Sequence, residues 1–352
     1  MSTRSPTRRA PRPPTLVDAL IPLTFLVVSL VSAIVIYRDD AILGPVQVAL
    51  FLSAAVAAQV GYKNGHSIAD LSKAAVDSVA SAMGAIFILL TVGALIGVWN
   101  MSGTIATLTD WGIRVLSVDF FYVTAAVICA VVALAVGSSW TVMGTIGVAL
   151  VAISEALGLN PALAAGAVIS GAYFGDKMSP LSETTNLAAA VAGTDLYKHI
   201  RSMMATTVPS IIIALGIYLI LGLRARPETD VFTESGLEAI EENFATGIVP
   251  VLPLVVVIVL ALRKVPPTLA ILAGALTGGL VAMIVQTDVV LRFVDDDTLS
   301  TPVALVKGVW DALATGVVAD TGSNALDDLV SGGGMESRLI TIWLVVTARG
   351  VG

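Results

Sequence analysis

The sequence predicts an all-α protein that crosses a membrane many times, because of its composition and its long apolar runs. Of its 352 residues, 56% are hydrophobic and 13% are charged, whereas a soluble domain carries about 25% charged residues. The apolar residues stand in continuous runs of the length that spans a bilayer as a helix. The lipid bilayer is therefore the first expected partner, and the net charge of −7 disfavours nucleic acid as another.

Polar stretches divide the chain into four predicted parts. Residues 1–14 are basic and proline-rich, which is typical of a disordered cytoplasmic tail. Residues 15–226 form a first transmembrane half that contains the most informative motif. Residues 227–245 form an acidic aqueous loop, and residues 246–352 begin a second transmembrane half.

The first half begins with apolar runs at Leu16–Tyr37, 41–61 and 83–99, each of which predicts a span. Between the last two, residues 67–82 place apolar side chains at helical spacing, with charged ones on the other side. This pattern predicts an amphipathic helix at the membrane interface. Residues 100–116 are too polar for a regular span and are expected to form an interfacial or re-entrant segment.

A polar island at residues 171–187 lies between an apolar helix and a run of small residues. Within it stand Asp176, Lys177, Ser179, Ser182, Glu183, Thr184, Thr185 and Asn186. Ionisable groups at membrane depth cost about 2.5–3.5 kcal/mol each on insertion scales, so they indicate a functional site. Gly175 and Pro180 favour an unwound backbone here. The alternative is a loop outside the bilayer, where the same residues cost nothing.

A second polar interruption follows the apolar run at residues 120–136. It places four hydroxyl groups close together, on Ser138, Ser139, Thr141 and Thr145. A helix broken at membrane depth requires protein groups or a water-filled cavity to satisfy its freed backbone. The alternative is close helix packing, which Gly, Ser and Thr also permit.

The residue types of both interruptions suit a site for Na⁺, which prefers carboxylate, hydroxyl, amide and backbone carbonyl oxygens. Asp176, Glu183 and Asn186 are the candidate Na⁺ ligands, and the hydroxyl groups of both interruptions are candidate neutral ligands. A proton-coupled exchanger needs a carboxylate at which H⁺ and Na⁺ compete, and Lys177 beside Asp176 is placed to tune that competition.

The chain also contains a weak internal symmetry. A span, an amphipathic segment and a second span occur at residues 46–99 and again from residue 268 onwards. Inverted repeats with broken helices are the architecture of secondary transporters. The second copy has no counterpart of the two polar interruptions, so we expect an incomplete second repeat in a truncated chain, unless the repeat is illusory.

Three motifs resemble the signature of the NhaC-type sodium/proton antiporter family. They are GDKMSPLSETTNLA at residues 175–188, GSSWTVMGT at residues 137–145, and SGGGM at residues 331–335 followed by Thr341-Ile-Trp343. The resemblance covers roughly residues 16–347. It implies a multi-pass protein of the cytoplasmic membrane, with inverted repeats and re-entrant hairpins, that exchanges Na⁺ for H⁺. The departure is at residues 345–352, where the chain stops inside a helix that family members continue and Arg349 replaces apolar residues.

Two alternatives to Na⁺/H⁺ exchange stay open. The family resembled also includes exchangers of malate with H⁺ for lactate with Na⁺, so an organic anion is an alternative substrate. A truncated, non-functional fragment is the other. We expect no enzyme, because the sequence presents no nucleophile–base set or cofactor loop. We also expect no cofactor beyond the transported Na⁺ and H⁺, and homo-oligomers are possible.

Overall fold

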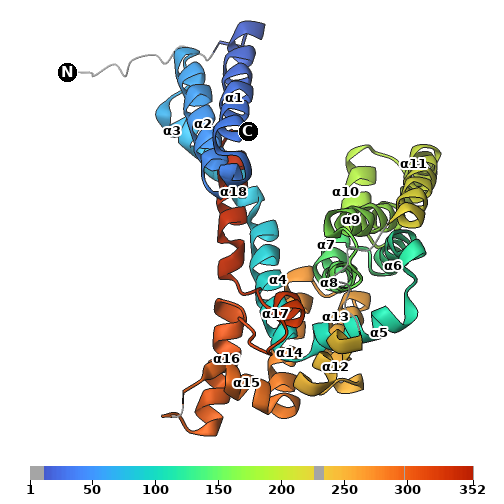
Figure 1. Cartoon of the computed structure of the whole chain (residues 1–352). Coiled ribbons are helices and arrows are strands. Elements are labelled where there is room, and N and C mark those ends of the chain that lie inside the picture. Colours follow the sequence, from blue (N-terminus) through green and yellow to red (C-terminus); the bar gives the residue numbers. More distant parts are fainter. Residues whose placement is uncertain (1–11, 226–233, 297, 352) are drawn as a thin grey trace. The chain divides into compact units, whose positions relative to one another are not determined.

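The computed structural model describes residues 12–225, 234–296 and 298–351, and within these ranges the regular structure is helical, with no strand (Figure 1). The chain divides into two compact units. The first contains residues 1–89 together with 338–352, and the second contains residues 90–337. The predicted all-α fold is confirmed.

The first unit is a bundle of long apolar helices. Its elements are α1 (Leu16–Tyr37), α2 (Pro45–Lys63), α3 (Ile68–Ser81), the first turns of α4 (Met83–Met101) and α18 (Leu339–Val351). The predicted spans at Leu16–Tyr37, 41–61 and 83–99 correspond to α1, α2 and α4. The predicted amphipathic segment is α3, which begins at a capping box formed by Ser67 and Asp70.

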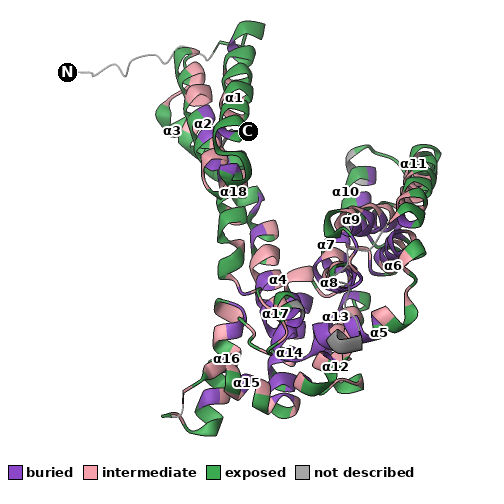
Figure 2. Ribbon diagram, in the orientation of Figure 1, coloured by how far each residue is buried: buried purple, intermediate pink, exposed green. Residues whose placement is uncertain are grey.

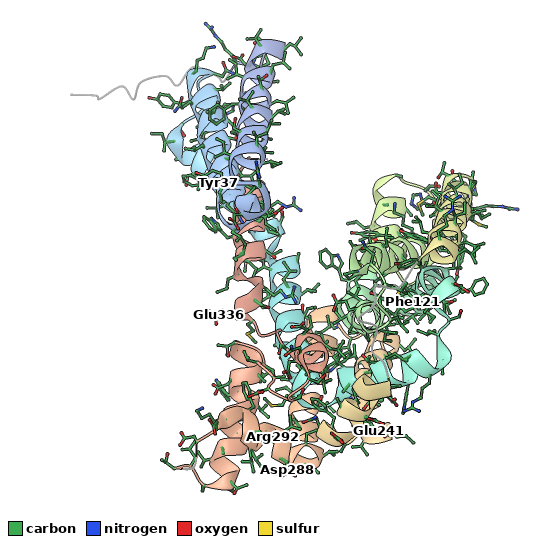
Figure 3. The ribbon with its side chains drawn as sticks, viewed as in Figure 1. Tyr37, Phe121, Glu241, Asp288, Arg292 and Glu336 are labelled. Atoms are coloured by element: carbon green, nitrogen blue, oxygen red, sulfur yellow. The ribbon has the colours of Figure 1, made fainter. Side chains whose placement is uncertain are left out.

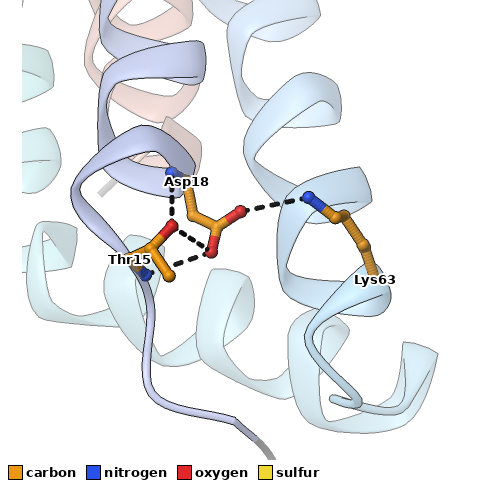
Figure 4. A network of polar contacts seen from close by, with 3 residues as sticks. All are labelled: Thr15, Asp18 and Lys63. Atoms are coloured by element: carbon orange, nitrogen blue, oxygen red, sulfur yellow. Dashed lines mark hydrogen bonds and ion pairs between the residues drawn. The ribbon is translucent and has the colours of Figure 1, made fainter.

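The start of α1 is fastened to the end of α2 by a small polar network (Figure 4). Thr15 caps α1, and its Oγ1 donates a 2.8 Å hydrogen bond to Asp18 Oδ2 while accepting one from Asp18 N. The other carboxylate oxygen of Asp18 lies 3.3 Å from Lys63 Nζ. Because the side chain of Asp18 is almost fully buried, its charge requires these partners.

The second unit contains the remaining helices. They are α5 (Thr104–Val115), α6 (Phe121–Val136), α7 (Ser139–Val142), α8 (Val148–Ala156), α9 (Pro161–Met178), α10 (Glu183–Val191), α11 (Leu196–Arg224), α12 (Glu234–Asn243), α13 (Ile248–Leu262), α14 (Pro267–Val285), α15 (Thr287–Val294), α16 (Thr301–Ala314) and α17 (Asn324–Val330).

A large hydrophobic cluster of this unit is built around the close pairing of α6 with α9 (Figure 2). A Cβ atom on Gly171 would lie 2.0 Å from the carbonyl oxygen of Ala126, and one on Gly175 would lie 2.2 Å from that of Ala130. Glycine at these positions lets the two backbones approach closely, as small residues do between membrane helices. Cys129, the single cysteine of the chain, is buried in this core.

Seven described helical segments are long and apolar enough to cross a membrane, and an eighth would be the pair α12–α13, which is bent by 91°. Large apolar side chains are exposed along α1 and α11. In water such surfaces would be costly, but in a bilayer they face lipid. The predicted multi-pass membrane protein is confirmed in this respect.

Two polar stretches of the sequence contain helices. Residues 100–116, expected to be interfacial or re-entrant, contain α5, most of whose residues are buried in the second unit. Residues 227–245, expected to be an aqueous loop, contain α12 where they are described, and Ile240 and Phe244 are buried. Helix α12 therefore packs as part of the unit. Its acidic composition concealed this, because only one face needs to be apolar.

Candidate functional site

The first helix break lies at residues 179–182, between α9 and α10. Helix α9 is capped at its start by Asn160, whose Oδ1 accepts hydrogen bonds from the N–H groups of Ala162 and Leu163. It continues through Gly175 and Asp176 and ends at Ser179, which has an extended backbone. The expectation that Gly175 unwinds the helix is wrong, because its role is to pack α9 against α6. Pro180, as expected, lies within the break.

The second break follows α6, at the hydroxyl-rich interruption that the sequence predicted. Gly137 has a left-handed backbone with φ of +74°, which ends α6. Ser138 then caps α7, because its Oγ accepts hydrogen bonds from Thr141 N at 3.3 Å and Thr141 Oγ1 at 3.0 Å. A π-helical turn at Met143–Gly147 joins α7 to α8. Such turns often occur at functional sites.

The two breaks lie against each other. Ser139 Oγ donates a 3.0 Å hydrogen bond to Asp176 Oδ2. Ser179 Oγ donates a 2.7 Å bond to the carbonyl of Leu134, in the last turn of α6. A Cβ atom on Gly137 would lie 2.7 Å from the carbonyl carbon of Leu181. Two polar segments that are separated in sequence therefore form one site.

The hydroxyl groups at the start of α10 hold the first break in place. Thr185 Oγ1 lies 3.4 Å from the carbonyl oxygen of Asp176 and 3.3 Å from that of Lys177, near the end of α9. Ser182 Oγ accepts from Thr185 N and lies 3.0 Å from Thr184 Oγ1. These contacts satisfy carbonyl and N–H groups that the break would otherwise leave unpaired.

Asn186 spans the break with its side chain. Its Nδ2 donates to the carbonyl oxygens of Pro180 at 2.9 Å and Ser182 at 2.7 Å. The side-chain oxygen Oδ1 makes no hydrogen bond to a described residue. Thr145, in the second break, donates a 2.6 Å bond to the carbonyl of Thr141. The side chain of Glu183 lies outside the described residues.

Most of the predicted site residues are withdrawn from solvent. Asp176 is 7% exposed, and Ser139, Thr141, Thr145, Ser179, Ser182 and Thr185 are buried. Ser138 is half-buried, whereas Thr184 and Asn186 are exposed. The site is thus a buried carboxylate surrounded by hydroxyl groups, with an amide at its edge.

The expected partnership between Asp176 and Lys177 is absent. Lys177 is exposed, and among the described residues no cation forms an ion pair with Asp176. Neighbouring residues of a helix point about 100° apart, so adjacency in sequence did not bring the charges together. The carboxylate accepts its described hydrogen bond from the neutral hydroxyl of Ser139.

Sequence reasoning missed a second buried polar group, at the bend between α4 and α5. Ser102 Oγ lies 2.8 Å from Thr104 Oγ1, which donates a 2.6 Å bond to the carbonyl of Pro250 in α13. Asn100, Thr107, Thr109 and Asp110 are also buried. The available signal was the clustering of hydroxyl residues around Gly103, which has a left-handed backbone.

The fold and the site define a multi-pass α-helical membrane protein with a buried carboxylate at the meeting of two broken helices. Residues 171–352 match the model of the Na⁺/H⁺ antiporter family. The chain belongs to this family, and it is a multi-pass protein of the cell membrane.

Its relatives differ in what their names say they exchange. The chain is 35% identical to the Na⁺/H⁺ antiporter NhaC of Alkalihalophilus pseudofirmus, over 95% of this chain and 69% of the relative. It is 35% identical to the malate-2H⁺/Na⁺-lactate antiporter of Bacillus subtilis, over 78% of this chain and 58% of the relative. It is 32% identical to the arginine/ornithine antiporter ArcD of Halobacterium salinarum, over 96% of this chain and 67% of the relative.

The matched regions thus cover 58% to 69% of these relatives' length. No solved structure matches the chain significantly.

Proposed function

We propose that this protein exchanges Na⁺ for H⁺ across the cell membrane, and that the two ions compete for the carboxylate of Asp176. The observation that supports this most is the position of Asp176. It is a buried carboxylate, without a described cationic partner, at the point where the two helix breaks meet. Membership of the Na⁺/H⁺ antiporter family points the same way.

The electrostatics of such a site explain why exchange would be obligatory. A bare carboxylate is costly to hold in a low-dielectric interior, and either a bound proton or a bound Na⁺ removes most of that cost. A conformational change that carries Asp176 between the two sides of the membrane is therefore easier with one ion bound than with none. Since both ions use the same carboxylate, binding of one releases the other.

The neighbouring oxygens supply the remaining ligands in this proposal. Ser139 Oγ already touches the carboxylate. Ser138, Thr141, Thr145, Ser179, Ser182, Thr184 and Thr185 provide further hydroxyl oxygens around the two breaks. The side-chain oxygen of Asn186 is open to a cation because Nδ2 makes the hydrogen bonds that fix the amide. We include Glu183 as a further Na⁺ ligand.

Everted membrane vesicles containing the 352-residue chain test this proposal. Adding Na⁺ to vesicles with an imposed pH gradient should dissipate the gradient, and the Na⁺ concentration needed for half the effect should rise as the pH falls. D176N should abolish the response. The control D77N, an exposed carboxylate paired with Lys73, should retain it. Unchanged exchange in D176N would remove Asp176 from the mechanism, and no response from the wild-type chain would defeat the proposal.

A second candidate is Na⁺-coupled exchange of an organic ion. Relatives of similar identity are named for exchange of malate for lactate and of arginine for ornithine. Counterflow of labelled malate, lactate or arginine into proteoliposomes separates the two candidates. Na⁺-dependent uptake of any of these would favour the organic substrate, whereas H⁺ movement without such uptake favours Na⁺/H⁺ exchange.

A further inference from the structure

A small cavity lies in the second unit, among elements that contribute nothing to the Asp176 site. Its volume is about 110 Å³, and its walls include the end of α4, α15 and the segment Val317–Thr321. We call it the Asn100 cavity after its most buried polar side chain. Its size suits a small ion with one or a few water molecules.

Asn100 is a buried polar residue of the cavity wall. It stands at the end of α4, is 2% exposed and lines the cavity. No described residue hydrogen-bonds its side-chain amide. Buried amides are almost always hydrogen-bonded, and one that opens into a cavity without a protein partner indicates that something in the cavity satisfies it.

The segment after α16 presents further oxygen atoms. Three of its N–H groups donate hydrogen bonds to the segment that follows. Val317 N donates to Gly332 O at 3.0 Å, Ala319 N to Ser331 Oγ at 2.9 Å and Thr321 N to Asp327 Oδ1 at 2.7 Å. The carbonyl oxygens of residues 318–320 accept no hydrogen bond from a described residue. Unwound backbone whose carbonyl oxygens are free is the usual cation ligand in transporters.

The polarity of the surrounding helices favours a cation. Helix α4 ends at Met101, which lines the cavity, and α12 ends at Asn243, next to the lining residue Phe244. These ends carry partial negative charge. Asp320, an exposed residue, also lines the cavity.

One positive charge lines the same cavity, that of Arg292 on α15 (Figure 3). Its guanidinium forms hydrogen bonds with Asn243 at the end of α12. Nη1 donates to Asn243 Oδ1 at 3.1 Å and Nη2 to Asn243 O at 3.2 Å. Because two of its N–H groups are directed at α12, Arg292 stabilises a helix end and leaves the oxygen atoms of Asn100 and Asp320 available.

We propose that the Asn100 cavity binds a small monovalent cation, through the side-chain oxygens of Asn100 and Asp320 and the free carbonyl oxygens of residues 318–320. It is a second cation site, separate in its residues from the Asp176 site, and it does not depend on the exchange proposed above. Hard oxygen ligands with a single carboxylate suit Na⁺ better than a transition metal.

Calorimetric titration of the purified chain with NaCl, at constant ionic strength in choline chloride, tests this site. The D176N background removes the buried carboxylate of the first site. In that background Na⁺ binding should persist, and D320N should weaken it roughly tenfold or more, because affinity follows the charge of the ligand set. The control D328N removes an exposed carboxylate of the neighbouring helix that does not line the cavity, and should leave the affinity unchanged.

Several results would overturn the proposal. One is the loss of all Na⁺ binding in D176N alone, and another is equal Na⁺ affinity with and without D320N. A third is a heat of binding that disappears when sodium gluconate replaces NaCl, because that heat would then come from chloride. The exposed position of Asp320 makes D320N compatible with folding, and monodisperse elution on size exclusion checks this. N100A provides a second, independent variant with the same expected loss. Failure of ion exchange in vesicles would leave this binding result unaffected, so the two proposals fail separately.

Discussion

Ser139 Oγ donates a 3.0 Å hydrogen bond to Asp176 Oδ2, and this contact joins the segment that follows α6 to the end of α9. Both residues are buried. A hydroxyl can donate to a carboxylate and can also present its lone pairs to a cation. The pair therefore sets the environment in which Asp176 would exchange a proton for Na⁺.

Removing the hydroxyl should weaken Na⁺ exchange without removing the carboxylate. A hydrogen bond to a charged group contributes about 1.5–3 kcal/mol, so S139A should raise the Na⁺ concentration for half-maximal exchange about tenfold to a hundredfold. Exchange in everted vesicles measures this. The control S210A removes a hydroxyl of α11 that bonds only to its own helix, at Thr206 O. Equal Na⁺ dependence of S139A and S210A would contradict the role given to Ser139.

The contact between Gly137 and Leu181 should be as important as the hydrogen bond. Alanine at Gly137 would have to adopt a left-handed backbone and would place its Cβ atom 2.7 Å from the carbonyl carbon of Leu181. Backbone atoms cannot move aside as a flexible side chain can. We therefore expect G137A to separate the breaks and to abolish exchange.

Gly193 provides a matched control for this substitution. It has a similar left-handed backbone, with φ of +63°, but a Cβ atom there meets no atom within 4 Å. Both variants incur the left-handed cost of about 1–2 kcal/mol, and only G137A adds the collision. Vesicle exchange and thermal unfolding should therefore separate the two. Similar losses in both would mean that the contact with Leu181 is unimportant.

The sequence predicts the parts of this site that depend on local backbone preferences, and it does not predict the contacts between helices. Pro180 cannot continue a regular helix, so the first break was predictable. Gly175 was misread because glycine is found both where a helix unwinds and where two helices touch, and only the position of Ala130 decides between them. The contact between Ser139 and Asp176 depends on the packing of α6 against α9, which no local pattern encodes.

Contacts between distant helices also explain why the burial of α5 and α12 was not predicted. The hydroxyl residues of α5 have the composition of an interfacial segment, and the sequence gives no sign that Thr104 is buried and bonds to Pro250 in a distant helix. The acidic residues of α12 suggested a loop, yet Ile240 occupies its inner face. By contrast, the lengths and positions of α1, α2 and α4 follow from apolar runs alone, because a bilayer fixes the length of a span. The internal repeat stays a prediction.

Arg114 of α5 forms two ion pairs, one within its own helix and one with α12, and the two should contribute unequally to stability. Arg114 Nε lies 2.7 Å from Asp110 Oδ1, and its Nη2 lies 3.0 Å from Glu241 Oε1. Asp110 is buried. Glu241, labelled in Figure 3, is exposed. These two carboxylates raise the pKa of Arg114, with Asp110 the larger cause, so its charge persists at all working pH values.

R114Q should therefore lower the unfolding temperature clearly more than E241Q. The first variant leaves the buried carboxylate of Asp110 without its cation, whereas the second removes only a solvent-exposed pair, which contributes little. Added salt should diminish the effect of E241Q and leave more of the effect of R114Q, since partly buried pairs are screened less than exposed ones. An equal loss in both variants would show that Asp110 is not the partner that matters.

Gly97 allows a similar test of packing around the glycine-rich segment at residues 331–335. A Cβ atom on Gly97 would lie 2.1 Å from the carbonyl oxygen of Ala312 and 3.0 Å from Gly334 N. Forcing atoms into such a site costs about 1–3 kcal/mol, so G97A should unfold at a lower temperature. Gly216 in α11 has no atom within 4 Å of the same position, and G216A should be neutral or slightly stabilising because alanine favours helix.

Cys129 supplies the measurement for this comparison. It is the single cysteine of the chain and is buried, so a thiol-reactive fluorophore labels it only as the second unit unfolds. The detergent-purified variants are heated in the presence of such a dye. G216A should unfold at the temperature of the wild type or slightly above it, and G97A should unfold at a lower temperature than the wild type. If G97A unfolds at the same temperature as the wild type, then the glycine-rich segment has room to move away from α4. Its close approach to that helix would then not contribute to stability.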